Sequence, residues 1–525
     1  MKSKTTNQHD SKVVNDSLKK VAKGTIIVFI GLFIFTIFNF VARLLLIRNW
    51  SQSDFGIFSL AFTIITLLTT VSTLGFKNGI VRNIAYARGK KDKERITDLI
   101  KSSVILVIIL SFFISIMIFL FSEAISKIVF DDIALILPLQ IFSISIPILT
   151  LIFILTSIFR GFDNVVPQVI FHYSLLYLLF TAFIIIIIFL GLDFIFVIIS
   201  FVIASLISLI ILLFYTKKKL LKKLVRTDKK INFGVSKSLI FFSLPLLSSA
   251  IIMSLNKRAG ILFLGSLKSS TDVALFSSVG PLSEIIAFLL STMIVIYMPI
   301  ISGLYSQGKI KEMKRNYLVL TKWLSFAALP IFLILVLYPN TILQTLFGPK
   351  YIPAVEILII LSFASMFNNF VGPCGSCIIS IGKTRLIMYS MIISLVFNIV
   401  LAVILIPLFG IIGAAIATAV GVITSNIFKT WKLYKLSGIQ PISKNLMKLL
   451  FSSLFFILMI FFATKYLLAI NWWMLPIMLI SFYLIEFICL IATRSIDVED
   501  SILIKSLLNK VGIKSSFLEK IFKLR

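Results

Sequence analysis

The feature that most constrains this chain is a series of apolar stretches of about 20 residues, separated by short charged clusters. A helix rises 1.5 Å per residue, so a stretch of that length crosses a hydrocarbon core of about 30 Å. Charged residues make up only 14% of the 525 positions, against roughly 25% in soluble domains. Backbone polar groups in lipid must pair within the membrane-spanning structure itself, so these long stretches are predicted to be helices.

The stretches predict an all-α polytopic membrane protein with about fourteen transmembrane helices. The expected spans are 24–47, 55–76, 101–121, 134–158, 167–190, 194–216, 238–265, 273–300, 317–339, 354–380, 387–409, 411–434, 448–470 and 472–493. Very short turns at Gly191–Asp193 and Pro407–Gly410 predict two tight antiparallel hairpins.

The net charge is +30, and the basic residues are distributed unequally between the two expected sides of the membrane. If the chain begins inside, most of its 51 lysines and arginines fall on the inner side. The basic residues expected outside are Arg48, Lys127, Lys257, Arg258, Lys268, Lys350 and Lys465. This asymmetry predicts a multi-pass protein of the cell membrane with cytoplasmic N- and C-termini. The basic loops are expected to face anionic membrane lipids, and nucleic acid is not expected as a partner.

An internal repeat recurs at an offset of about 218 residues. Asp54–Ser59 is echoed by Asp272–Ser277, and Tyr86–Lys90 by Tyr305–Lys309. Phe130 and Phe347, Gly161 and Gly382, and Gly191 and Gly410 follow nearly the same offset. The repeat predicts two pseudo-symmetric six-helix bundles that share one orientation, with a substrate site between them.

These patterns together predict six segments. The expected segments are a cytoplasmic tail over 1–23, an N-terminal six-helix bundle over 24–216, a basic cytoplasmic linker over 217–237, a C-terminal six-helix bundle over 238–434, an extra helix pair over 448–493 and a basic cytoplasmic tail over 494–525.

An ordered set of short motifs resembles the MOP (multidrug/oligosaccharidyl-lipid/polysaccharide) flippase superfamily, and specifically its polysaccharide-transport branch. The motifs are Leu44–Leu46, Asp54–Ser59, Leu74–Phe76, Phe242–Leu247, Leu346–Tyr351 and Gly410–Thr418. The resemblance covers about residues 15–440 and extends to helix number, order and orientation. One departure concerns the seventh helix, which often ends with an acidic residue in this branch. Asn256–Gly260 stands there instead, so the use of H⁺ or Na⁺ as a coupling ion stays open.

The resemblance implies a flippase that moves polyprenyl-(pyro)phosphate-linked oligosaccharide from the cytoplasmic to the outer leaflet, for assembly of surface polysaccharide or glycoprotein glycan. Alternatives in the same superfamily are a lipid-linked peptidoglycan-precursor flippase and a drug/cation antiporter. The antiporter branch usually has twelve helices, so the pair at 448–493 disfavours it. A membrane glycan ligase or polymerase would need catalytic groups on sizeable outer loops. The expected outer loops are short and lack histidine, so an enzyme is not expected.

Basic residues at matching depths in the two halves are the main candidates for substrate binding. Arg43 lies 20 residues after Lys23 in the first span, and Lys257 and Arg258 lie 20 and 21 residues after Lys237 in the seventh. Guanidinium and ammonium groups in a cavity would pair with the phosphate of the lipid carrier. The alternative is snorkelling of these side chains to the outer headgroups.

Further polar residues fall inside expected spans. Glu284 is a candidate for substrate or ion handling, because a carboxylate in lipid needs a partner or a wet cavity. The candidates for hydrogen bonds to sugars are Asn39, Asn256, Asn368 and Asn369. Asparagine in membranes more commonly joins helices, so that reading stands beside the functional one.

Three other features are better explained by structure. His172 is a lone histidine for which helix packing is expected, and Glu486 lies in the helix pair outside the repeat. Cys374 and Cys377 form a C-x-x-C pattern, but the sequence offers no second ligand pair. We therefore expect no metal site and no cofactor.

Overall fold

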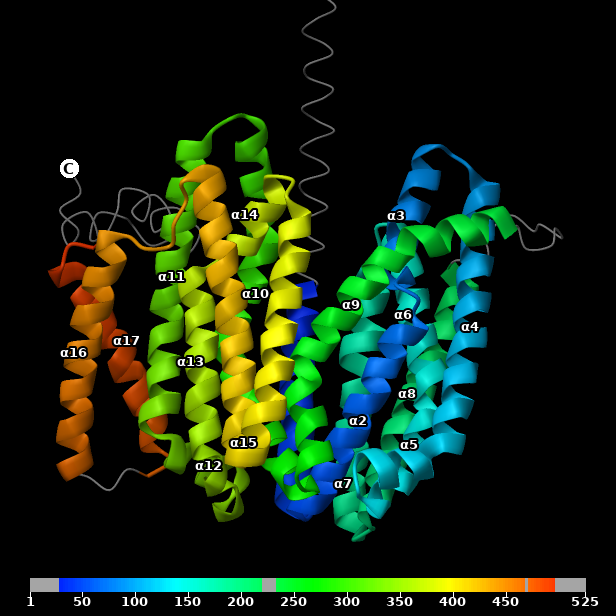
Figure 1. Cartoon of the computed structure of the whole chain (residues 1–525), viewed down its shortest axis with the longest axis horizontal. Helices are drawn as coiled ribbons and strands as arrows, with labels where there is room; N and C mark the ends of the chain where they lie inside the picture. The colour runs from blue at the N-terminus through cyan, green and yellow to red at the C-terminus, as the bar shows by residue number, and fades with distance from the viewer. Residues whose placement is uncertain (1–27, 220–232, 468–470, 496–525) are drawn as a thin grey trace, which may run out of the picture. The chain divides into compact units, whose positions relative to one another are not determined.

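The computed structural model describes residues 28–219, 233–467 and 471–495, and these residues form helices and connecting turns with no β-strand (Figure 1). The predicted tail 1–23, most of the linker 217–237 and nearly all of the tail 494–525 lie outside the described residues. The principal helices are Val28–Asn49, α2 (Gln52–Ser72), α3 (Phe76–Gly89), α4 (Lys93–Ala124), α5 (Ile136–Ser143), α6 (Ser145–Gly161), α7 (Leu176–Leu190), α8 (Phe194–Lys219), α9 (Phe233–Leu267), α10 (Ser270–Ser306), α11 (Ile310–Leu337), α12 (Pro339–Phe347), α13 (Val355–Val371), α14 (Cys374–Ser380), α15 (Thr384–Ser437), α16 (Lys444–Leu467) and α17 (Met474–Ala492).

The described part of the chain contains the predicted number of spans. Twelve helices are long and apolar enough to cross a membrane, and α5 with α6 forms one more span that bends by 41°. α15 consists of two helices that meet at Gly410, whose φ of 55° and ψ of −128° are not helical. Dividing α15 there gives fourteen spans, as the sequence predicts.

Two expected spans differ from the observed helices. The second span continues through a break at Leu74 and Gly75, both with positive φ, into α3, so the segment Gln52–Gly89 is 38 residues long. The tenth span is broken at Gly372, where φ is 66° and ψ is −155°. Pro373 follows directly and has no N–H to continue the helical hydrogen bonds.

The described chain divides into two compact units. The first contains the residues up to Ser278 together with Asn398–Ala414, and the second contains Val279–Phe397 and the residues from Ala415 onward. The domains 24–216 and 238–434 inferred from the repeat stay a prediction.

Aromatic side chains form much of the core of the first unit. Phe58 and Phe62 of α2 meet Phe142 of α5, Phe180 of α7 and Phe201 of α8, with ring centroids between 5.2 and 6.2 Å apart. The rings alternate between edge-to-face and stacked pairs, the arrangements that aromatic quadrupoles favour. This cluster packs α2, α5, α7 and α8 of the first unit against one another.

Glycines allow close backbone contacts in this unit, between α2 and the start of α10 and between the α2–α3 break and α9. A Cβ atom at Gly56 would overlap the carbonyl oxygen of Ser270, and one at Gly75 would overlap the backbone of Ser243 and Leu247. Lipid provides no hydrophobic driving force between helices, so membrane helices associate through close van der Waals packing, which small residues allow. α9 therefore packs against α2, α3 and α4 in the first unit.

The repeat has a local structural counterpart. At the start of α2, Asp54 accepts hydrogen bonds from the backbone and hydroxyl of Ser51, whose hydroxyl accepts from the Asp54 backbone. Ser269 and Asp272 form the same capping box at the start of α10. Gly191 and Gly410 both adopt positive φ at the end of a helix. The repeated motifs are therefore helix-start and helix-end signals.

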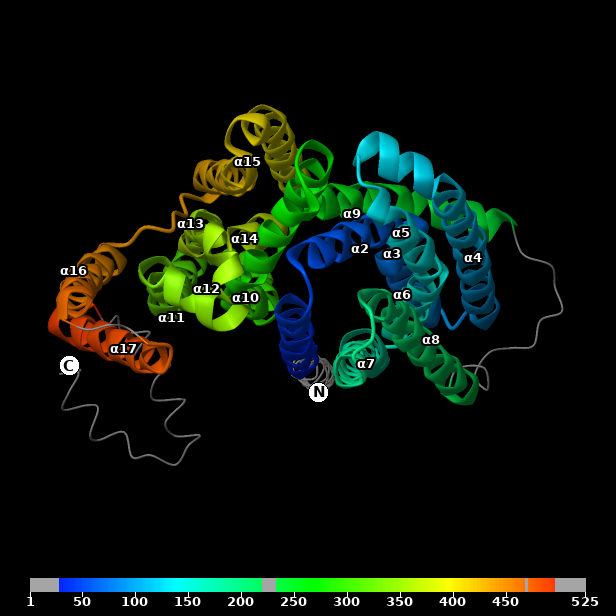
Figure 2. The ribbon, with the colours of Figure 1, turned by 90° about the horizontal axis from the view of Figure 1, so that it is seen from below.

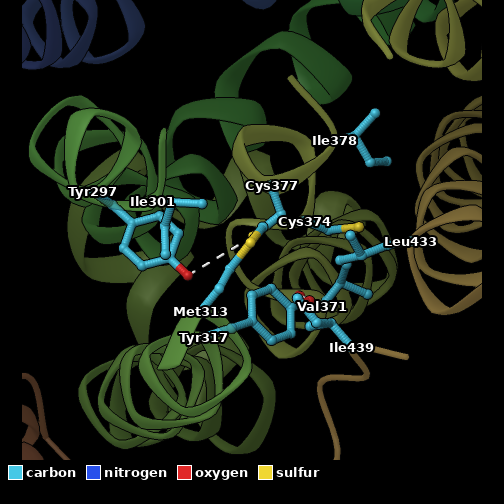
Figure 3. Packing of buried hydrophobic residues seen from close by; sticks show 10 residues of the cluster. All are labelled: Tyr297, Ile301, Met313, Tyr317, Val371, Cys374, Cys377, Ile378, Leu433 and Ile439. Carbon is cyan, nitrogen blue, oxygen red and sulfur yellow. Dashed lines mark hydrogen bonds between the residues drawn. The ribbon is translucent and has the colours of Figure 1, made fainter. Parts of the chain in front are cut away.

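The second unit contains an apolar cluster where α10, α11, α14 and α15 meet. Figure 3 shows Cys374 and Cys377 among Tyr297, Tyr317 and aliphatic side chains. Both cysteines are buried and unoxidised, and the Tyr297 hydroxyl lies 3.8 Å from the Cys377 sulfur. No group of histidine, cysteine or carboxylate side chains among the described residues could hold a metal ion. Cys374 and Cys377 pack against the side chains of neighbouring helices, a use of small residues that is common in membranes.

The last helix pair belongs to the second unit, where α17 contacts both α16 and α11 (Figures 1 and 2). Tyr483 of α17 donates to the Ala327 carbonyl at 2.8 Å, and the buried Lys322 ammonium donates to the Ser495 carbonyl at 2.9 Å. Tyr338 and Thr464 are hydrogen-bonded at 3.1 Å. Polar contacts to α11 and the turn after it thus hold the pair.

Candidate functional site

Arg43 is half-buried in helix Val28–Asn49 of the first unit. Its guanidinium donates a hydrogen bond to the backbone carbonyl of Ser277, and its Cζ lies 5.9 Å from the centroid of the Phe55 ring. An arginine inside a membrane helix is costly unless it faces protein or water. Here the Arg43 guanidinium faces protein, through a backbone carbonyl and the face of an aromatic ring.

The structure brings a second predicted cation to the same region. The Tyr177 side chain of α7 lies within electrostatic range of both Arg43 and Arg258. Arg258 is half-buried on α9, whereas its neighbour Lys257 is exposed. Tyr177 is absent from the sequence prediction, because a tyrosine in an apolar run carries no signal of the cations that approach it.

The two asparagines of this unit have different environments. Asn39 is half-buried in helix Val28–Asn49. The Asn256 side-chain amide donates to the Ile252 carbonyl at 3.0 Å, and the Asn256 backbone carbonyl accepts from Asn398 at 3.3 Å. Asn256 thus takes part in a bond between α9 and α15, the use of asparagine that is common in membranes.

The remaining predicted residues lie in the second unit. Asn369 is fully buried and donates to the carbonyls of Ile286 at 2.7 Å and Ser365 at 3.3 Å. The Asn368 carbonyl oxygen accepts from Asn426 at 3.1 Å. These bonds join α13 to α10 and α15, whereas Glu284 is exposed on α10.

The first unit also contains a basic group that the sequence reading missed. Lys77 of α3, Arg160 of α6 and His172 of the π-helical segment Gln168–Leu175 interact electrostatically with one another. Lys77 lies just outside the expected span 55–76, His172 is expected to pack between helices, and more than 80 residues of sequence separate Lys77 from Arg160. Only the packing of α3 and of the π-helical segment on α6 brings them together.

Comparison with known families decides the class of the chain. Residues 21–305 match the family model described as "Polysaccharide biosynthesis protein", and residues 245–404 match the MatE model. The chain belongs to the polysaccharide-transport branch of the MOP flippase superfamily. It is therefore a multi-pass membrane protein of a family of transporters and flippases.

Solved structures share the fold of this MOP superfamily member. The lipid II flippase MurJ in an inward closed conformation aligns with a TM-score of 0.69 and 15% identity, over 92% of this chain and 100% of that chain. A multidrug resistance MATE family transporter in an inward-facing conformation aligns with a TM-score of 0.63 and 15% identity, over 77% of this chain and 94% of that chain. At this identity the similarity concerns the fold alone.

A curated relative adds no activity to the comparison. An uncharacterized membrane protein of Methanocaldococcus jannaschii is 28% identical over 182 residues, which are 35% of this chain. The matched segment spans 36% of that relative.

Proposed function

We propose that this MOP superfamily member moves a polyprenyl-(pyro)phosphate-linked oligosaccharide from the cytoplasmic to the outer leaflet by alternating access. The proposal places both termini in the cytoplasm, following the distribution of basic residues. The substrate has an apolar chain that stays in lipid, together with an anionic phosphate and a polar glycan that lipid excludes. The protein has to shelter the last two while the chain remains in the bilayer.

The observation that carries the proposal is the pair of half-buried arginines in the first unit. Arg43 and Arg258 both interact electrostatically with Tyr177. Arg43 is oriented by its contacts with the Ser277 carbonyl and the Phe55 ring. Oriented guanidinium groups bind phosphate through charge-assisted, often bidentate hydrogen bonds. We assign Arg43 and Arg258 to the phosphate, with Lys257 as a supporting cation.

The polar residues receive the remaining roles in this proposal. Asn39 and Asn256 belong to the same unit as the arginines and are assigned to sugar hydroxyls. Asn368, Asn369 and Glu284 of the second unit are assigned to contacts with the glycan or with a coupling ion, H⁺ or Na⁺. The hydrogen bonds of Asn369 to two backbone carbonyls give it a structural duty as well.

One alternative cargo has an observation of its own. The alignment with the lipid II flippase MurJ covers that chain completely, including its full set of helices, which favours a lipid-linked peptidoglycan precursor as the second candidate. A cationic drug is less suited to a unit whose candidate binding groups are arginines, because like charges repel. Both alternatives keep the protein in the class of transporters.

Depletion of the protein in its native cells tests the cargo. We expect polyprenyl-linked oligosaccharide to accumulate in the cytoplasmic leaflet, where a glycan-binding probe reaches it only after permeabilisation. Peptidoglycan precursors should keep their normal level, and sensitivity to cationic drugs should not change. Accumulation of the peptidoglycan precursor alone would favour the second candidate. Increased sensitivity to cationic drugs, with normal levels of both lipid-linked precursors, would contradict both flippase assignments.

A further inference from the structure

Three segments of the first unit bring basic side chains to one place. Lys77 follows the break between α2 and α3, Arg160 lies at the last turn of α6, and His172 lies in the segment Gln168–Leu175. Phe153 of α6 contacts two of these side chains: its ring centroid lies 5.0 Å from the Lys77 ammonium and 4.5 Å from the His172 ring centroid. We call Lys77, Arg160 and His172 the basic triad.

No carboxylate among the described residues balances the charges of Lys77 and Arg160 in the basic triad. Lys77 and Arg160 lie close enough to interact electrostatically with each other and with His172. All three residues are half-buried. Among the residues that the structure describes, no aspartate or glutamate forms an ion pair with Lys77 or Arg160. Arg88 provides the contrast, because it lies at 3.0 Å from Asp163 in the same unit.

An unsatisfied polar atom points to the same conclusion. The Nδ1 atom of His172 is buried and has no hydrogen-bond partner among the described residues. Buried polar atoms nearly always have a partner, so an exception indicates an absent ligand or water. Cations gathered in a membrane protein without counter-charges favour an anionic ligand for the same reason.

The chemistry of the surrounding groups identifies the class of anion. The site offers a guanidinium fork, an ammonium group and an imidazole, with the Tyr173 ring stacked 4.5 Å from His172. The Tyr173 hydroxyl accepts from Gln168 at 3.1 Å and keeps its own proton to donate. A guanidinium, an ammonium and a hydroxyl donor near one another suit an oxyanion with several acceptor oxygens, such as phosphate or pyrophosphate. Irregular π-helical geometry, as in Gln168–Leu175, often occurs at functional sites.

We infer that the basic triad of Lys77, Arg160 and His172 binds the phosphate or pyrophosphate group of a polyprenyl lipid. This site is separate from Arg43 and Arg258, because the rings of Tyr173, Phe35 and Tyr177 lie between the two sites. The Phe35 ring centroid lies 5.6 Å from that of Tyr173 and 4.7 Å from that of Tyr177. The identity of the lipid carrier rests on the proposed function, whereas the anion site does not. With the N-terminus inside, Arg160 and His172 lie near the cytoplasmic ends of their helices, and Lys77 lies deeper, where α2 meets α3.

Binding of inorganic pyrophosphate to the purified full-length protein tests the anion site, with isothermal titration calorimetry as the readout. Lys77→Gln and Arg160→Gln should each weaken binding by roughly ten- to a hundredfold, the effect of one lost charge-assisted hydrogen bond. Lys90→Gln removes an exposed lysine outside the triad and should leave binding unchanged. Equal affinity of the native protein and both triad variants would overturn the site.

Conservative variants guard against loss of folding. Lys77→Arg keeps the charge and should retain most of the affinity, whereas Arg160→Lys keeps the charge but loses the planar fork and should retain part of it. These variants test the site even if the neutral variants fail to fold. His172→Gln keeps a donor without the ring and should weaken binding by a smaller factor. Charge-retaining variants that fold normally but bind no pyrophosphate would contradict a site built on charge.

Nanodisc binding then distinguishes the sources of the phosphate group. A polyprenyl pyrophosphate should compete with inorganic pyrophosphate at the triad, whereas phosphatidylglycerol at the same mole fraction should not. Equal competition by phosphatidylglycerol would show that the triad binds headgroups of bulk lipid and not specifically the polyprenyl carrier. Pyrophosphate binding that depends on the triad, in a protein without leaflet exchange, would leave the anion site standing and refute the proposed function.

Discussion

At the scale of single residues, the decisive question is whether Arg43 captures phosphate or only anchors a helix. Its hydrogen bond to the Ser277 carbonyl occupies one part of the guanidinium fork. Guanidinium carries five N–H donors in a planar fork, a geometry that suits an oxyanion as well as a backbone carbonyl. The two roles of Arg43 make different predictions for its substitution.

Substitution of Arg43 separates the two roles. Arg43→Ala should lower glycan export by roughly ten- to a hundredfold at normal protein abundance, because one charge-assisted bond is lost. Arg43→Lys should restore export in part, since it keeps the charge and loses the planar fork. Export and membrane abundance are measured together for both variants. Normal export by Arg43→Ala at normal abundance would end the phosphate role of this residue.

Glu486 is expected to contribute nothing to transport. Its side chain is fully buried in α17, and neither carboxyl oxygen has a hydrogen-bond partner among the described residues. An isolated buried carboxylate is very costly, so the group should be uncharged. Glu486→Met should raise the thermal unfolding temperature in detergent, by removing an unsatisfied polar group worth about 1–3 kcal/mol, and should keep transport. A transport defect in a well-folded Glu486→Met protein would instead give the carboxyl a functional role.

Sequence patterns located some of these residues and missed others for a physical reason. Arg43 and Arg258 stand out because a charge within an apolar run is conspicuous and the repeat places both at similar depth. Lys77 lies one residue beyond an expected span and reads as part of a loop. Its proximity to His172 depends on helix packing, which leaves no trace in local sequence.

At the scale of secondary-structure elements, the close approach of α2 to the start of α10 depends on glycine. Gly56→Ala would place a methyl group against the Ser270 carbonyl oxygen, which belongs to the backbone and cannot rotate away. Overpacking of this kind typically costs about 1–3 kcal/mol, so the unfolding temperature should fall. Gly89→Ala is the matched control, because nothing lies within 4 Å of its Cβ position. Equal unfolding temperatures for the two variants would refute the tight contact.

Hydrophobic length predicted where helices exist better than where they break. Fourteen spans follow from the need to satisfy the backbone in lipid, and the described residues give this number when α5 with α6 is counted as one span and α15 is divided at Gly410. The breaks at Gly75 and Gly372 depend on backbone conformation and on neighbours such as Thr321, against which Gly372 lies. An apolar run that contains one glycine reads as continuous, so the bent and broken spans were not predicted.

At the scale of the whole molecule, the orientation in the membrane is open to a direct test. Reporter fusions after Lys90, Lys311 and Lys435 should report a cytoplasmic location, and fusions near Lys127 and Lys350 the exterior. Basic residues are retained on the cytoplasmic side during insertion, and the expected inner loops hold most of them. A cytoplasmic signal at Lys350 would contradict the predicted orientation of the second half.

The most direct measurement of the central proposal is leaflet exchange by the purified protein in vesicles of defined lipid. A polyprenyl-pyrophosphate-linked oligosaccharide is incorporated in both leaflets, and the fraction accessible to an external glycosidase is followed over time. We predict that the native protein makes nearly all of the cargo accessible, whereas protein-free vesicles and the Arg43→Ala protein expose little beyond the outer half. Exposure that stops at the outer half with the folded native protein, with and without ion gradients, would contradict the flippase assignment.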